Sequence, residues 1–256
     1  MSVSSINNGL SKSYEQLSSM KQINSSADNP AGLAIVEKME SQTNGYDVGN
    51  ANGKTGQDLI KTAEGGLASI QDNLQRIREL ALQASNGIYA PEDKKAIQKE
   101  IEQLKQGIQD AAKGTEFNTL KLLDGSMADM NLALNPDGTG MEIQMYNSTL
   151  ESLGIADFDV TGSFNIEDID RAIEKVSDAR GSLGATYNAL EHATAYSSLS
   201  GENLTAASSR IEDLDVEKAI SEMKKQEVLD GYALMVQKLK MEQDEKQLNI
   251  LNVNQL

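Results

Sequence analysis

The residues that most often carry out chemistry in proteins are sparse in this chain or lack suitable neighbours. There is one histidine, His192, and no cysteine. Thiol catalysis, disulfides and zinc–thiolate sites are therefore excluded, and His192 has no second metal ligand near it in the sequence. Carboxylates are abundant, but they follow helical spacing, at which they cap helix ends or form weak surface pairs. These residue types predict neither a catalytic site nor a metal site.

Two short motifs resemble known sites only in part. Glu64-Gly65-Gly66 lacks the strand and the following Gly-Lys-Ser/Thr of a phosphate-binding loop. Asp137-Gly138 lacks the further acidic residues and the terminal glutamate of a calcium-binding loop, so it is better explained as a turn. No serine lies in the Gly-x-Ser-x-Gly motif of a nucleophile elbow. We therefore predict a protein that is not an enzyme and holds no cofactor.

The composition indicates long helices with an acidic surface. Of 256 residues, 39% are hydrophobic but only 4% are aromatic, and 3 are proline, which favours thin layers of uninterrupted helices. The net charge of −16 disfavours nucleic acid and acidic membranes as partners. No run approaches the roughly 18 apolar residues of a membrane-spanning helix. The N-terminal sequence lacks the basic and apolar regions of a cleaved signal peptide, so we expect a cytoplasmic protein or export by another route.

A seam of apolar residues at alternating steps of three and four runs over residues 60–84, as is typical of a helix that packs along another helix. This segment would be a rod of about 37 Å. A second helix should begin at Pro91, antiparallel to the first because the connection is short. A third should begin after an Asn165 cap and end at Gly201, with Arg180 in the one polar position of its seam. The predicted core positions are Leu67, Ile70, Leu74, Ile77, Ile97, Ile101, Leu104, Ile173, Val176 and Leu183.

Both ends of the chain are predicted to be helices with narrow apolar stripes. The first covers about residues 3–20, and the last runs from Val216 to about residue 250 after an Asp215 cap. The N-terminal helix either packs on its own domain or is ordered only on assembly, and the sequence leaves both open. The stripe of the last helix changes phase between Met223 and Leu229, which indicates more than one partner face. The stripe residues are Val3, Ile6, Leu10, Leu17, Val216, Ile220, Met223, Leu229, Tyr232, Val236 and Leu239.

Glycines at near-regular spacing of four occupy positions Gly45, Gly49, Gly53 and Gly56. Each costs about 1 kcal/mol in a helix relative to alanine, so local propensity predicts a loop. The spacing also allows a helical stripe of small residues at which another rod approaches closely.

The middle of the chain changes from helical to strand-like periodicity. Apolar and polar residues alternate on both sides of the turn-rich sequence Asn-Pro-Asp-Gly-Thr-Gly at residues 135–140, which predicts a β-hairpin. Because two strands are not stable alone, the hairpin should fold onto the helices. The predicted fold class is mainly α, with long antiparallel helical rods in a coiled-coil-like bundle and one small hairpin.

Several motifs resemble those of the bacterial flagellins. QLSSMKQINSSADNPAGLAIVEKM at residues 16–39 is similar to the family's LSSG-x-RIN-x-A-x-DD-A-AGLAIS-x-KM. SSRIEDLDVEKAISEMKKQEVL at residues 208–229 is similar to its SRIED-x-D-x-A-x-E-x-S-x-M-x-x-x-x-I-L. TAEGGL, LQRIRELALQASNG and TEFNTLKLLDG follow the family in the same order. The resemblance covers about residues 10–125 and 165–235.

This resemblance implies discontinuous domains built from both halves of the chain. Residues 1–29 and 215–256 would form an inner helical domain with its connecting segments, and residues 30–214 a second helical domain that includes the hairpin region 117–150. The glycine-rich segment would be helical, within one rod over residues 30–85. The middle of the chain is too short for the variable outer domains of many flagellins, so this would be a near-minimal subunit. It would assemble head to tail into an extracellular filament for swimming, exported without a cleaved signal peptide.

The resemblance also implies partners. Other copies of the chain would order the terminal helices, which we expect to be disordered in the monomer, and an export chaperone and the cap and junction proteins would bind the subunit. The segment LQRIRELALQASNG resembles the site bound by the vertebrate innate immune flagellin receptor, although Gly107 replaces a glutamate of receptor-active members. Helical geometry predicts an exposed Leu80 there, available to the receptor or to a neighbouring protofilament. The predicted contact residues are Gln75, Arg76, Glu79, Leu80 and Gln83.

Two other classes of protein remain open. The hook–filament junction protein shares the terminal motifs, but it usually has a longer middle and lacks the intact pair RIRELALQASNG and SRIED. A cytoplasmic coiled-coil scaffold with no flagellar role would share only the helices. Neither would form long homopolymers, so electron microscopy of the purified chain after addition of salt or seeds distinguishes them.

Overall fold

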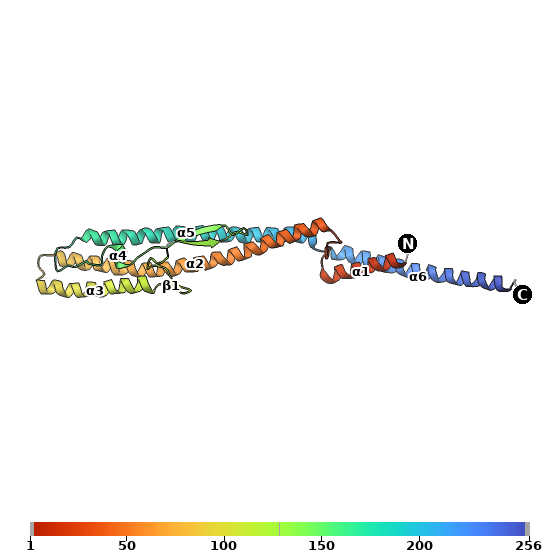
Figure 1. The fold of residues 1–256 in the computed structure, drawn as a ribbon, viewed down its shortest axis with the longest axis horizontal. Coiled ribbons are helices and arrows are strands. Elements are labelled where there is room, and N and C mark those ends of the chain that lie inside the picture. The colour runs from red at the N-terminus through yellow and green to blue at the C-terminus, as the bar shows by residue number, and fades with distance from the viewer. Residues whose placement is uncertain (1–2, 128, 254–256) are drawn as a thin grey trace. The chain divides into compact units, whose positions relative to one another are not determined.

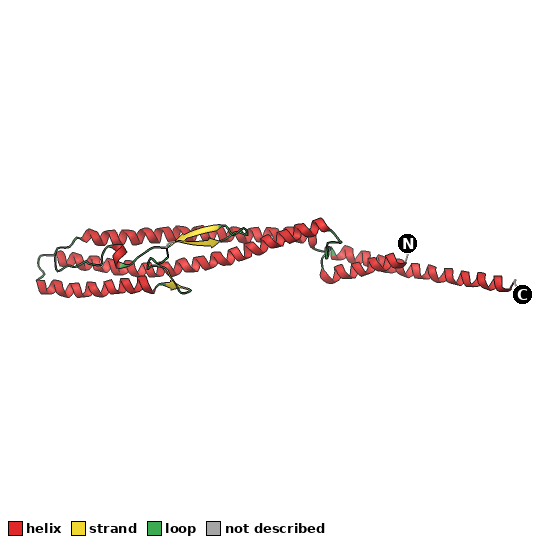
Figure 2. Cartoon of the chain, in the orientation of Figure 1, coloured by secondary structure: helices red, strands yellow, loops and turns green. Residues whose placement is uncertain are grey.

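The structure, a computed structural model, describes the backbone of residues 3–127 and 129–253 and the side chains of residues 9–127 and 129–246. Long helices make up most of the described chain, as Figures 1 and 2 show, and its strands form two small antiparallel pairs. The helices are α1 (Val3–Ser19), α2 (Pro30–Ser85), α3 (Pro91–Gly114), α4 (Leu150–Leu153), α5 (Ile166–Glu212) and α6 (Val216–Val253). The strand pairs are β1 (Glu116–Phe117) with β2 (Leu120–Lys121), and β3 (Asp129–Ala133) with β4 (Gly140–Gln144). The predicted fold class is confirmed.

The chain forms two compact units. The terminal unit contains Met1–Ser41 and Asn203–Leu256, and the central unit contains Gln42–Glu202. Helices α2 and α5 pass through both units.

Three helices of the central unit share one apolar core. Arg76 of α2 pairs with Glu100 of α3, and Arg78 of α2 pairs with Asp170 of α5, so α2 contacts both of its neighbours. The seam positions of α2 from residue 60 to residue 84 are fully buried. Of the other predicted core positions, Ile97, Ile101, Val176 and Leu183 are buried, whereas Leu104 and Ile173 are half-buried at the edge.

A buried lysine occupies the α3 seam beside the predicted Leu104. Lys105 is buried between the turns that carry Ile101 and Ile108. Its Nζ lies 3.0 Å from the Glu102 carboxylate and donates to the Phe158 carbonyl oxygen at 3.4 Å. The aliphatic part of the side chain can therefore pack in the core while the charge remains paired. This contact fastens the loop before α5 to α3.

Helix α5 continues through Gly201 to Glu212, so the prediction that the third helix ends at Gly201 is wrong. Gly201 is buried, and a Cβ added there would lie 3.9 Å from side-chain atoms of Tyr46 and Asp47 on α2. Packing between the two long helices outweighs the cost of about 1 kcal/mol that glycine imposes in a helix. Arg180 occupies its predicted seam position, where Nη1 donates to Oε1 of Gln71 at 2.6 Å.

The glycine-rich segment is helical within α2, and the β3–β4 hairpin lies directly on its glycines. A Cβ added at Gly49 would lie 2.0 Å from the Leu134 carbonyl oxygen, and one added at Gly53 would lie 2.2 Å from Cγ2 of Thr194 on α5. Asn52 Nδ2 donates to the Ala133 carbonyl oxygen at 3.0 Å. The small-residue stripe is therefore the correct interpretation of this spacing. The loop interpretation fails because tertiary contacts outweigh local propensity.

The hairpin and the helix starts follow the predicted turn and cap residues. Strands β3 and β4 pair in register with Leu132 opposite Met141, and Gly138 in their turn has φ of 82°. The Asn29 side chain accepts from the Gly32 N–H at 2.9 Å. Asn165 and Asp215 accept in the same way from backbone N–H groups in the first turns of α5 and α6.

Gly49→Ala should lower the free energy of unfolding by about 1–3 kcal/mol, because the new methyl group overlaps the Leu134 carbonyl and displaces the hairpin. Gly65→Ala is the matched control, since a Cβ at Gly65 of the same helix meets open space. That variant should gain up to about 1 kcal/mol from helix propensity. Denaturant unfolding followed by circular dichroism measures both. A Gly49→Ala protein as stable as Gly65→Ala would contradict the close contact.

Candidate functional surfaces

The side chains that the structure describes form no group of three or more His, Asp or Glu placed to hold a metal ion. His192 is exposed on α5. In the part of the chain that was searched, no helix combines the length and apolar character needed to span a membrane. The features that remain as candidates for function are surfaces, and they lie on α6, at the junction between α1 and α2, and on α2.

In the terminal unit, α1 packs antiparallel on the first part of α6. Tyr14 donates its hydroxyl hydrogen to the Glu227 carboxylate at 3.1 Å, which raises the pKa of Tyr14. A Cβ added at Gly9 would touch the Gln226 side chain at 3.8 Å. The half-buried residues of α6 recur at steps of four and three and mark the face toward α1: Ala219, Met223, Gln226, Asp230 and Ala233.

Helix α1 is too short to cover α6. At 1.5 Å per residue its 17 residues span about 25 Å, whereas the 38 residues of α6 span about 57 Å. The half-buried face of α6 accordingly ends near Ala233. From there to residue 246, all described side chains of α6 are exposed.

The face of α6 opposite α1 carries an apolar stripe that no described residue covers. Its four side chains are 53–72% exposed and follow steps of four, three and four residues. At about 100° per residue they fall within roughly 60° of one another, on the side opposite the half-buried face. We call these residues the outer stripe: Val228, Tyr232, Met235 and Leu239.

The predicted stripe residues of the two terminal helices fall in different places. Met223 is half-buried on the α1 side, as are Leu10 and Leu17 on the α6 side of α1. The side chains of Val3 and Ile6 lie outside the described residues. The remaining predicted positions of α6 are exposed: Val216, Ile220, Leu229, Tyr232, Val236 and Leu239.

Two outer-stripe residues, Val228 and Met235, were missed by the sequence analysis. The expected seam contains Leu229 and Val236, each one residue after an outer-stripe position. The spacing of 228, 232, 235 and 239 was visible in the sequence as an unbroken alternation of four and three.

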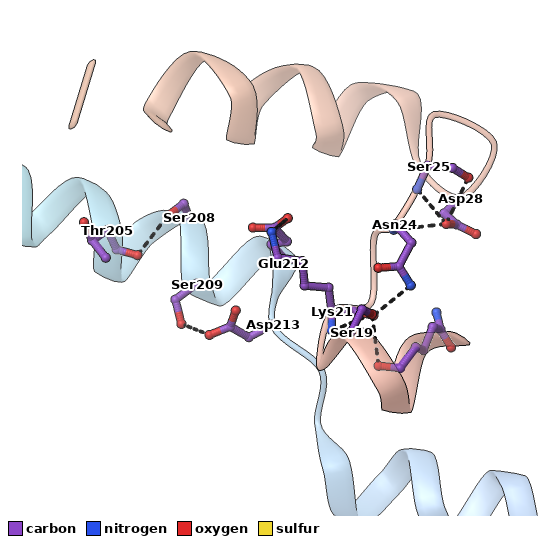
Figure 3. A network of polar contacts seen from close by, with 11 residues as sticks. Ser19, Lys21, Asn24, Ser25, Asp28, Thr205, Ser208, Ser209, Glu212 and Asp213 are labelled. Carbon is purple, nitrogen blue, oxygen red and sulfur yellow. Dashed lines mark hydrogen bonds and ion pairs between the residues drawn. The ribbon is translucent and has the colours of Figure 1, made fainter. Parts of the chain in front are cut away.

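The junction that follows α1 is held by hydrogen bonds and an ion pair to the end of α5 and the residues just after it. The Gln22 N–H donates to the Glu212 carbonyl oxygen at 2.7 Å, and the Leu214 N–H donates to the Met20 carbonyl oxygen at 2.9 Å. Lys21 Nζ lies 2.6 Å from the Glu212 carboxylate (Figure 3), which raises the pKa of Lys21. Met20 has φ of 58°, a left-handed conformation that costs a residue with a side chain about 1 kcal/mol. The surrounding hydrogen bonds hold this strained residue in place.

Asp28 organises the turn between the junction and α2 (Figure 3). Its carboxylate accepts from the N–H groups of Asn24 and Ser25 at 3.1 and 3.0 Å and lies 2.7 Å from Lys12 Nζ on α1. The ion pair with Lys12 and the two N–H donors lower the pKa of Asp28 from 3.8 to about 2. This carboxylate therefore links α1 to the turn that leads into α2.

On α2, the structure places four of the five predicted contact residues on the surface: Gln75, Arg76, Glu79 and Gln83. Arg76 donates to Glu100 Oε1 at 2.8 and 3.0 Å and to Glu79 Oε2 at 3.0 Å. Leu80 is only 2% exposed, so the expectation of an exposed Leu80 is wrong. Because α2 packs against both α3 and α5, its buried arc is wider than a two-helix seam and includes Leu80.

Gly107 lies away from this arginine cluster. A Cβ added there would lie 3.3 Å from Nδ2 of Asn73, one turn before Arg76 on α2. The glutamate that pairs with Arg76 across the α2–α3 interface is Glu100. The cluster thus has a carboxylate from α3 in spite of the glycine.

Most of the chain is similar to known bacterial flagellins. Residues 1–128 match the family model of the bacterial flagellin N-terminal helical region, and residues 166–248 match that of the C-terminal helical region. A flagellin of Halalkalibacterium halodurans is 38% identical over 226 residues, which cover 86% of this chain and 83% of that protein.

Two solved structures are similar in fold. The crystal structure of Bacillus cereus flagellin has a TM-score of 0.52 at 28% identity, over 57% of this chain and 88% of that chain. A structure described as a flagellar hook-associated protein of Vibrio parahaemolyticus has a TM-score of 0.60 at 16% identity, over 73% of this chain and all of that chain. At that identity the second likeness concerns the fold alone.

Asp28→Asn should remove the contribution of the Asp28 carboxylate to stability. Because this pKa is 3.8 unfolded and about 2 folded, that contribution is complete above about pH 4 and is lost as the pH falls through about 2. The amide hydrogens of Asn24 and Ser25 should therefore exchange faster in the variant at about pH 6, and the difference should shrink below about pH 4. Asp72→Asn, at an exposed carboxylate of the central unit, is the control. Equal exchange in Asp28→Asn and wild type at about pH 6 would contradict this role.

Proposed function

This chain belongs to the bacterial flagellin family, whose members are structural subunits of the extracellular flagellar filament and not enzymes, and we propose that it polymerises head to tail through its terminal helices. The outer stripe of α6 is the observation that carries this proposal. Fully burying a side chain of this size stabilises the buried state by about 1.5–3 kcal/mol. No described part of the same chain buries the outer stripe. Identical subunits that bury such a stripe in a contact that does not close on itself form a helical filament. This filament would serve swimming.

We also propose that the subunit in the filament consists of two domains, each built from both halves of the chain. Residues 1–29 and 215–256 would form the inner helical domain, and residues 30–214 the second helical domain with the hairpin region 117–150. The breaks between α1 and α2 and between α5 and α6 support these boundaries. The compact units of the single chain divide elsewhere, after Ser41 and after Glu202, within α2 and α5. Contacts with neighbouring subunits would decide which division operates in the polymer.

Before assembly the outer stripe would need protection, because an exposed apolar stripe favours unwanted association. We propose that an export chaperone provides this protection until the subunit reaches the filament. The cap and junction proteins would meet the same terminal surfaces at the two ends of the filament. The hook–filament junction alternative shares the fold, but the identity to flagellins favours a filament subunit.

The exposed part of the α2 surface supports a second proposal, recognition by the vertebrate innate immune flagellin receptor. Arg76 is half-exposed and is held by Glu79 and Glu100, so its guanidinium group is already oriented for a partner. Leu80 would support this surface from beneath and would not anchor a partner. In the filament, the same residues would contact a neighbouring protofilament.

Tyr232→Lys should raise the critical concentration for polymerisation at least about tenfold, because it removes the apolar burial of one outer-stripe residue and places a charge there. Gln237→Lys is the matched control: it adds the same charge at an exposed α6 position outside the stripe. Sedimentation after addition of seeds measures both, with electron microscopy of the pellet. Equal assembly of the two variants would overturn the proposed role of the stripe.

Arg76→Ala should weaken binding of the receptor ectodomain about 10- to 100-fold, as expected for the loss of a charge-assisted hydrogen bond. Arg78→Ala serves as the control, because Arg78 is similarly exposed but pairs with Asp170 of α5. Surface plasmon resonance with monomeric subunits measures the affinities. Wild-type affinity for Arg76→Ala would remove the receptor proposal and leave the filament proposal unaffected.

A further inference from the structure

Methionine sulfur atoms are exposed mainly in the terminal unit. The chain has ten methionines and no cysteine, so its thioethers are its only sulfur groups. Among the described side chains, Met20, Met235 and Met241 are 56, 63 and 65% exposed, and all three belong to the terminal unit. Met145 in the central unit is 8% exposed. The sulfur atoms most accessible to a dissolved oxidant are therefore those of the terminal helices.

Two of these methionines belong to the apolar surface of α6. Met235 lies in the outer stripe, three residues after Tyr232 and four before Leu239. Met241 lies two turns after the exposed Leu234, on another side of the same helix. Any partner that buries these faces of α6 must bury the two thioethers with them.

We propose that Met235 and Met241 are peroxide-sensitive modification sites that control assembly of the subunit. Hydrogen peroxide transfers one oxygen atom to each sulfur. The O–O bond breaks, an S–O bond forms, the sulfur loses two electrons and the peroxide is reduced to water. The proposal rests on the proposed polymerisation through α6, because oxidation of these methionines affects assembly only if a neighbouring subunit buries them.

The modification converts an apolar contact into a polar one. A sulfoxide oxygen accepts hydrogen bonds from water in the free subunit, and it loses them if α6 is buried against an apolar partner surface. The oxidised stripe should therefore favour the free subunit over the polymer. Thiol-dependent methionine sulfoxide reductases return the sulfoxide to the thioether, so the block should be reversible.

Peptide mass spectrometry of the full-length wild-type subunit after peroxide treatment tests the site. Met235 and Met241 should each gain one oxygen atom about tenfold faster than Met145, which is the internal reference, because they are far more exposed. The oxidised subunit should then elongate seeds about tenfold more slowly than the untreated subunit. Subsequent treatment with methionine sulfoxide reductases and dithiothreitol should restore elongation.

The variant Met235→Leu/Met241→Leu separates these sites from other oxidation. Leucine keeps the apolar character and nearly the same volume, so the stripe stays apolar, and the elongation rate of each variant after peroxide is compared with its own untreated rate. After peroxide, the double variant should still elongate, whereas Met20→Leu, which removes the third exposed thioether, should be inhibited like wild type. If the double variant fails to assemble even untreated, reversal by the reductases in wild type decides the question.

Two results would overturn the proposal. One is normal elongation by wild-type subunits that carry sulfoxide at both positions. The other is equal inhibition of the double leucine variant by peroxide. If untreated wild-type subunits do not polymerise at all, the proposed function itself fails, which is a different outcome from unimpaired assembly of oxidised subunits.

Discussion

Helix α6 has apolar residues on more faces than the described part of its own chain covers. Helix α1 is less than half as long as α6 and packs on the face that contains Met223 and Asp230. The outer stripe lies opposite and remains in water. Exposed apolar surface of this kind favours association, and here α6 is uncovered along much of its length. The proposed polymerisation and its proposed sensitivity to oxidation both depend on this uncovered apolar surface of α6.

The central unit shows the opposite condition, because its long helix buries its seam within the same chain. Helix α2 contacts α3 through Arg76 and Glu100 and contacts α5 through Arg78 and Asp170. The apolar seam of α2 over residues 60–84 is fully buried. Nearer the start of α2, glycines let the hairpin approach the helix backbone, with Gly49 against the Leu134 carbonyl. This unit has a complete core of its own. We therefore expect the central unit to fold by itself and the terminal helices to need neighbouring subunits.

Local signals in the sequence predicted the helix starts, the α2 seam and the hairpin, because caps, heptad spacing and turn residues act over a few positions. The errors occurred where distant segments decide. Gly201 remains helical because it packs against Tyr46 and Asp47, far away in sequence. Leu80 is buried because α2 has two partner helices, and periodicity along one helix does not reveal how wide its covered arc is. On α6 the spacing of the outer stripe was present, but several apolar residues competed for the assignment, and only the position of α1 shows which face is free.

Hydrogen exchange of the amides of residues 232–246, compared between dilute subunits and filaments of the same protein, tests the central claim most directly. In dilute subunits no described residue outside α6 covers its side chains from residue 234 to residue 246, so the amides there should exchange nearly as fast as those of an isolated peptide. In filaments they should be protected as strongly as the α2 seam, because neighbouring subunits would cover the outer stripe. Strong protection in the dilute subunit, or fast exchange in the filament, would contradict the account.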